Sequence, residues 1–103
     1  MKNSVQSYVS SLNRRNFTNN TQRVLYTLLQ AAVKGDGWVS LKGFRVSSAG
    51  SRIRDLRQES NGGFNVTCSS AAQLGKAGNQ RTFYYRIGQR NLTVTQLRNV
   101  FGQ

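Results

Sequence analysis

Apolar residues at helical spacing predict a short amphipathic helix over residues 4–13. The positions follow an i, i+3, i+4, i+7 pattern and are Val5, Tyr8, Val9 and Leu12. Such a helix can pack on its own domain or on a second copy of the chain. Residues 14–20 are polar and predict a linker, in which Arg14 and Arg15 are available to bind phosphate or belong to a frayed segment.

The clearest helix is predicted over residues 21–34, where the apolar residues form one wide stripe. The stripe consists of Val24, Leu25, Leu28, Leu29 and Ala32. Asn20 or Thr21 is suited to cap the start, and Gly35 can end the helix in the left-handed conformation. We therefore expect this segment to supply a large part of the core.

A third helix, within residues 46–58, combines a narrow apolar stripe with several arginines. Ala49, Ile53 and Leu56 share one side, and Ser47 or Ser48 fits the N-cap. The opposite side carries Ser51, Arg54, Asp55 and Gln58, while Arg52 and Arg57 flank the stripe with guanidinium groups expected to be free. The outer face is therefore predicted to be basic and polar.

The residues between these two helices predict a turn at 35–37, a short strand at Trp38 and Val39, and a brief helix that begins after Ser40 and carries Leu41 and Phe44. Only a few residues separate this brief helix from the arginine-bearing one. Two helices joined by a tight turn are the geometry of a helix-turn-helix.

Residues 64–69 and 81–88 alternate apolar and polar side chains, which predicts two half-buried strands that pair. Residues 70–80 predict a protruding, mobile loop between them, and Thr93 or Thr95 fits the cap of a terminal helix. Four aromatic residues are expected in the core, Trp38, Phe44, Phe64 and Phe83, and the phase of Cys68 with Phe64 and Val66 places the single cysteine there as well. Tyr84 is out of phase with them and is expected at the surface.

Fifteen lysines and arginines against three acids give the 103-residue chain a net charge of +12. The acids, Asp36, Asp55 and Glu59, all lie mid-chain, so residues 1–35 and 60–103 carry positive charge only. Nucleic acid is the anionic partner that this distribution favours, because phosphates bound by arginine release their counterions. An acidic protein partner stays open. A membrane is not expected, because no apolar run approaches a spanning length.

The side-chain inventory argues against an enzyme, and we expect no catalytic residue, metal or cofactor. The chain has no histidine and one cysteine, which excludes the usual zinc sites and an internal disulfide. Asp55 and Glu59 are four residues apart and could share a metal, but pairing of Asp55 with Arg52 is the simpler interpretation.

The element order resembles a winged helix-turn-helix, a small DNA-binding domain common in bacteriophage and bacterial proteins. The resemblance covers residues 20–88 and includes an Arg-Ile-x-x-Leu-Arg pattern at Arg52, Ile53, Leu56 and Arg57. It implies an α+β fold with a three-helix core and a two-stranded wing hairpin. Short extra helices are expected within 1–19, which also holds the basic linker, and within 89–103; they depart from the plainest form of the family.

On this interpretation the helix at residues 48–58 reads duplex DNA, with Arg54 and Gln58 against base edges. The wing and linker are expected to contact phosphate or the minor groove. The full set of expected nucleic-acid contacts is Ser47, Ser48, Ser51, Arg52, Arg54, Arg57, Gln58, Lys76, Arg81, Arg86, Arg14 and Arg15. The protein would act by occupying its DNA site, as a transcription regulator or an architectural accessory factor. A homodimer is open as well, because two copies related by two-fold symmetry can read a palindrome.

Two other functions stay open. One is a phage effector that binds and inhibits a host protein complex, and the other is an RNA-binding protein, although the A-form major groove is too deep and narrow for a reading helix. The first fifteen residues lack the apolar core of a secretory signal. The expected location is therefore the cytoplasm, that of the bacterial host if the chain is phage-encoded.

Overall fold

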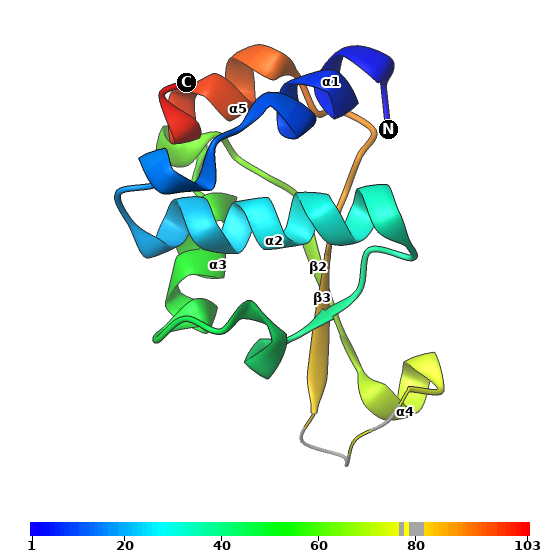
Figure 1. Cartoon of the computed structure of the whole chain (residues 1–103). Helices are drawn as coiled ribbons and strands as arrows, with labels where there is room; N and C mark the ends of the chain where they lie inside the picture. Colours follow the sequence, from blue (N-terminus) through cyan, green and yellow to red (C-terminus); the bar gives the residue numbers. More distant parts are fainter. Residues whose placement is uncertain (77, 79–81) are drawn as a thin grey trace.

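Five α-helices and a three-stranded antiparallel sheet form the fold, which a computed structural model describes for residues 1–76, 78 and 82–103 (Figure 1). In chain order the elements are α1 (Asn3–Ser11), η1 (Arg14–Asn16), α2 (Asn20–Lys34), β1 (Val39–Ser40), η2 (Leu41–Phe44), α3 (Ala49–Arg57), η3 (Glu59–Asn61), β2 (Val66–Ser70), α4 (Ala71–Leu74), β3 (Phe83–Ile87) and α5 (Val94–Phe101). The three η elements are single turns of 3₁₀ helix. The predicted α+β class is confirmed.

The helix α2 lies at the centre of the core. Its apolar stripe is closed off from solvent, with Val24, Leu25, Leu28 and Leu29 each 0% exposed. Figure 1 shows α2 crossing between α1 and α5 on one side and α3 with the sheet on the other. Because full burial of one such side chain is worth about 1.5–3 kcal/mol, this stripe holds α3 and the sheet in place.

The sheet has the strand order β1-β3-β2, and both pairings are antiparallel. The predicted pairing of the two long strands is confirmed, with Val66 opposite Ile87. The two residues of β1 add a third strand on the other edge of β3, where Val39 lies opposite Tyr85. The chain then enters η2 directly, and the Ser40 side chain caps that turn by accepting the N–H of Gly43, as expected.

The terminal helices pack on α2 and on each other. The Tyr8 hydroxyl donates to the main-chain carbonyl of Gln103 at 2.8 Å, and the Gln103 side chain forms two hydrogen bonds with the backbone of Asn13. Gln22, only 6% exposed, donates from its amide to the carbonyl of Val100 at 2.9 Å. The apolar stripe of α1 is thus covered within the chain, and both chain ends lie at the same end of the molecule (Figure 1).

Two predicted helix boundaries are wrong. The N-cap of α2 is Asn19 rather than Asn20 or Thr21, because its side chain accepts the backbone N–H of Gln22 at 2.9 Å. Gly35 ends the helix with φ −165°, which is extended rather than left-handed, while its N–H still bonds to the helix. At the C-terminal helix, Thr93 is the cap residue.

The core prediction fails toward the far end of the β2–β3 hairpin. Cys68 is exposed, and Phe83 is 44% exposed, although both are in phase with the buried Val66 and Ile87. The hairpin extends beyond the helices there (Figure 1), so the side of the strands that faces the core near Ile87 has no helix over it near Phe83. Trp38 is half-buried, whereas Phe44 and Phe64 are buried as predicted.

The segment between β2 and β3 is not simply a loop. Ala71–Leu74 forms the single turn α4, which begins with a capping box in which Ser70 and Gln73 each bond the other's backbone. Gly75 ends this turn in the left-handed conformation, with φ +65°. The expectation of a loop is therefore wrong at residues 71–74, and residues 77 and 79–81 lie outside the described part of the chain.

Candidate functional site

The outer face of α3 is polar, basic and exposed. Ile53 and Leu56 are 1% and 0% exposed and turn the opposite side of the helix to solvent. That opposite side carries Ser51 and Arg54, while Ser47 and Gln58 lie just before and just after the helix. All four residues are exposed. Together they offer hydroxyl, guanidinium and amide groups along α3 and at its two ends.

The three arginines of α3 differ in their contacts. Arg57 donates from Nε and Nη2 to the carbonyl oxygen of Val66, at 3.2 and 2.7 Å, and so joins the end of α3 to the start of β2. The expectation that its guanidinium stays free is wrong, because a tertiary acceptor nine residues along the chain lies within reach. Arg52 pairs with Asp55 at 3.3 Å, which confirms the predicted pairing and shows that the expectation of a free guanidinium is wrong for Arg52 too.

Arg54 is the arginine of this helix left for a ligand. Within the described part of the chain, no hydrogen bond, ion pair or ring contact engages its side chain. Gln58 follows the last turn of the helix, and its side-chain oxygen lies 3.5 Å from the amide of Asn61, a long contact that a ligand can replace. These two side chains form the centre of the candidate site.

The start of α3 is shaped by two left-handed residues. Arg45 has φ +57° and Ser48 has φ +58°, a conformation that non-glycine residues rarely adopt. Ser48 occupies the N-cap position, but its side chain makes no capping bond, which corrects the prediction for Ser47 or Ser48. A capping residue normally has an extended backbone that directs its oxygen at the first turn. The first-turn N–H groups of α3 are therefore not held by a side-chain cap and can meet an anionic oxygen.

Lys76 and Arg86, the described hairpin residues predicted to bind nucleic acid, lie near the turn between α2 and β1. The Nζ of Lys76 bonds to Oδ2 of Asp36 at 2.8 Å and lies 5.6 Å from the ring centre of Tyr84, which is half-buried. The guanidinium of Arg86 lies 4.6 Å from the ring centre of Trp38. The hydrogen bond from Lys76, followed by that from the backbone of Trp38, lowers the pKa of the Asp36 carboxyl.

The structure thus brings Lys76 and Arg86 together around the turn between α2 and β1. Among the described residues no hydrogen bond, ion pair or ring contact joins either side chain to α3. Arg81, also predicted for this hairpin, lies outside the described residues. The hairpin lysine and arginine are partly committed to the chain's own groups, which makes them weaker candidates than Arg54.

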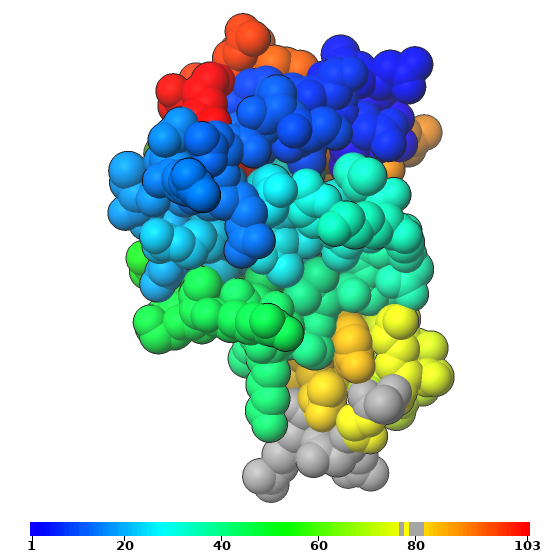
Figure 2. Space-filling view, viewed as in Figure 1, coloured from blue at the N-terminus to red at the C-terminus, as the bar shows by residue number. Residues whose placement is uncertain are grey.

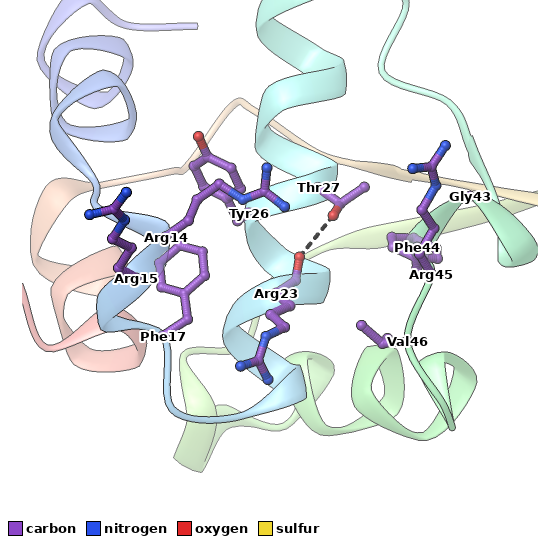
Figure 3. A pocket seen from close by; sticks show the side chains of 10 residues that line it. All are labelled: Arg14, Arg15, Phe17, Arg23, Tyr26, Thr27, Gly43, Phe44, Arg45 and Val46. Carbon is purple, nitrogen blue, oxygen red and sulfur yellow. Dashed lines mark hydrogen bonds between the residues drawn. The ribbon is translucent and has the colours of Figure 1, made fainter.

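Arg14 and Arg15 lie in η1 and border a cavity of about 430 Å³ with two further arginines that the sequence analysis did not single out, Arg23 and Arg45 (Figure 3). Arg23 lies on the polar face of α2, and Arg45 lies in the turn before α3. The spacing of these four arginines in the sequence does not indicate that they line one cavity. The available signal was the absence of acids from residues 1–35.

The described residues contain no group of three or more metal-binding side chains, and none of their helices is long and apolar enough to cross a membrane. Comparisons with models of protein families, with curated proteins and with solved structures each gave no match.

Proposed function

We propose that this chain is a DNA-binding protein of winged helix-turn-helix type that reads duplex DNA with α3. The order α2, β1, η2, α3, β2, β3 and the sheet order β1-β3-β2 support this architecture. In it, η2 and α3 are the helix-turn-helix pair and the β2–β3 hairpin is the wing. The extra helices α1 and α5 lie on the side of α2 away from α3 (Figure 1).

The exposed polar side chains along α3 and at its ends are the observation that carries the proposal. A helix fits the major groove of B-DNA, where arginine pairs with the two acceptors of guanine and glutamine with adenine. Arg54 and Gln58 supply those two side chains on a face held rigid by the buried Ile53 and Leu56. Ser47 and the first-turn amides of α3 lie at the start of the helix and suit backbone phosphate.

The charge distribution supports the same partner. Of the three acids, Asp36 and Asp55 are paired with Lys76 and Arg52, so little negative charge is left to repel a phosphate backbone. A net charge of +12 gives sequence-independent affinity through counterion release, on which base contacts then impose a preference. The protein acts by occupying its site, as a regulator or an architectural accessory factor.

Selection from a random pool of duplex DNA at physiological salt tests the proposal. An enriched motif is expected, and Arg54→Ala should bind that motif about 5- to 150-fold more weakly, which corresponds to about 1–3 kcal/mol, while its binding to random DNA changes little. The matched control is Arg90→Ala, which removes one exposed arginine from the loop before α5. Absence of enrichment, or equal losses for both variants on every sequence, overturns base reading by α3.

A protein-binding role is the second candidate, because two large apolar side chains are exposed next to each other. Leu41 and Phe83 are each 44% exposed and line one cavity of about 440 Å³ between η2 and β3. Exposed apolar side chains of this kind are common in protein interfaces. This role is favoured if the duplex pool enriches nothing and a partner protein binds the chain but not Leu41→Ser/Phe83→Ser.

A further inference from the structure

Four arginines from three separate segments line one cavity. Figure 2 shows these segments on one face of the molecule, with the segment around residues 14–15 in blue, α2 in cyan and the segment before α3 in green. Arg14 and Arg15 come from η1, Arg23 comes from α2, and Arg45 comes from the turn between η2 and α3. We propose that this cavity binds the phosphodiester backbone of nucleic acid next to the segment read by α3. The proposal rests on the proposed function for the identity of the ligand and extends the contact surface beyond α3.

No acid of the chain neutralises this cavity. None of its ten lining residues is acidic. Asp36 is paired with Lys76, Asp55 is paired with Arg52, and both Asp55 and Glu59 line a different cavity. Four like charges around one opening repel one another, and an anion from outside the chain relieves this repulsion.

Two of the four arginines are held by contacts with other side chains of the chain. Arg14 lies over the ring of Tyr26, with 5.7 Å from its guanidinium carbon to the ring centre, and Tyr26 in turn contacts the buried Phe17. Nη1 of Arg23 donates to Oδ1 of Asn20 at 3.0 Å. These contacts fix two of the four stems while leaving donors free, since one guanidinium carries five N–H groups.

The shape of the site favours an extended ligand over a single ion. In Figure 3 the four guanidinium groups stand apart around the opening and do not converge on one point. A polymer with a regular row of phosphates can meet several of them at once, whereas one phosphate ion cannot. Arginine also suits this ligand because its planar fork matches two phosphate oxygens.

The cavity is continuous with α3 along the chain. Arg45 and Val46 line it, and the next residues, Ser47 and Ser48, lead into the first turn of α3. A nucleic-acid strand that contacts the amides of this turn therefore has the arginines of the cavity beside it. Arg45 itself ends η2 in the left-handed conformation, with φ +57°.

The binding test uses Arg23→Gln/Arg45→Gln in the full chain and random-sequence duplex DNA over a range of salt concentrations. The slope of log K against log salt, where K is the association constant, is negative. Loss of two phosphate contacts should make it less negative by about two and weaken binding roughly 60-fold at 0.1 M salt. The matched control is Lys2→Gln/Arg90→Gln, which removes the same charge from two other exposed positions. Equal losses in both double variants overturn the proposal, and thermal melting verifies that each variant is folded.

A second measurement separates this site from the reading helix. The Nε–Hε NMR signals of arginine are assigned by single Arg→Lys substitutions and followed while duplex DNA is added, with inorganic phosphate as a separate probe. Shifts at Arg14, Arg23 and Arg45 as well as Arg54 support both assignments. Shifts at Arg54 alone refute backbone binding by the cavity and support duplex reading by α3. Shifts at the arginines of the cavity alone support backbone binding there and refute reading by α3. Saturation by inorganic phosphate at low millimolar concentration would overturn the polymer assignment in favour of a single-anion site.

Discussion

Arg54 and Arg57 are three residues apart on one helix, and the structure predicts opposite consequences for their removal. Arg57 donates two hydrogen bonds to the carbonyl of Val66, a residue that is 5% exposed. Hydrogen bonds from a charged donor contribute about 1.5–3 kcal/mol when buried, and because Arg57 is exposed we expect the change Arg57→Met to cost about 1–2 kcal/mol. Methionine keeps the packing of the stem, so this figure isolates the hydrogen bonds.

Chemical denaturation followed by circular dichroism measures that cost, and thermal melting should show it as a lower Tm, by roughly 4–8 °C per kcal/mol. Arg54→Ala should change the free energy of unfolding by no more than about 0.5 kcal/mol, because its side chain has no partner among the described residues. Its effect should appear in DNA binding instead. The reasoning is refuted if Arg57→Met melts like the wild type, or if Arg54→Ala is as destabilised as Arg57→Met.

Three further predictions concern stability and accessibility. Gln22→Ala should destabilise the fold by about 1–3 kcal/mol in urea denaturation, because it leaves the carbonyl of Val100 without its donor; an unchanged midpoint would contradict this. Burial raises the pKa of the Tyr8 hydroxyl, so its stabilising contribution is complete below pH about 10 and is lost as the pH rises further. The variant Tyr8→Phe should therefore show a smaller decline in the free energy of unfolding at alkaline pH. A decline identical to that of the wild type would refute this. Cys68 should react with a thiol reagent such as DTNB in the native state at a rate near that of the unfolded chain, whereas strong native protection would show that it is covered.

The helices could be predicted from the sequence because their burial follows a simple period. The stripe of Val24, Leu25, Leu28 and Leu29 faces the core along its whole length, and Ile53 with Leu56 does the same on α3. Periodicity reports which side of an element a residue occupies. It predicts burial well where a neighbouring element covers that entire side.

Strand alternation predicted burial wrongly where no neighbouring element covers the whole side of the strand. Phe83 shares a side with Ile87, but the hairpin passes the end of the helices between them, so one ring is exposed and the other side chain is 1% exposed. The contacts of the site were unpredictable for a related reason. The acceptor of Arg57 is a main-chain carbonyl on β2, and the position of Arg23 and Arg45 on one cavity depends on how α2 and η2 pack. Spacing along one helix predicts neither the acceptor of Arg57 nor the position of Arg23 and Arg45 on one cavity.

The joining of the chain ends also bears on how the fold assembles. The hydrogen bonds from Tyr8 to Gln103 and from Gln22 to Val100 span 95 and 78 residues. Contacts between such distant positions require closure of a long loop before they repay its entropy, and they slow folding relative to helical proteins built on local contacts. During synthesis the side of α1 that packs on α5 therefore stays uncovered by it until α5 has been made, whereas the contacts of α2 with α1 and with α3 join neighbouring segments and can form earlier.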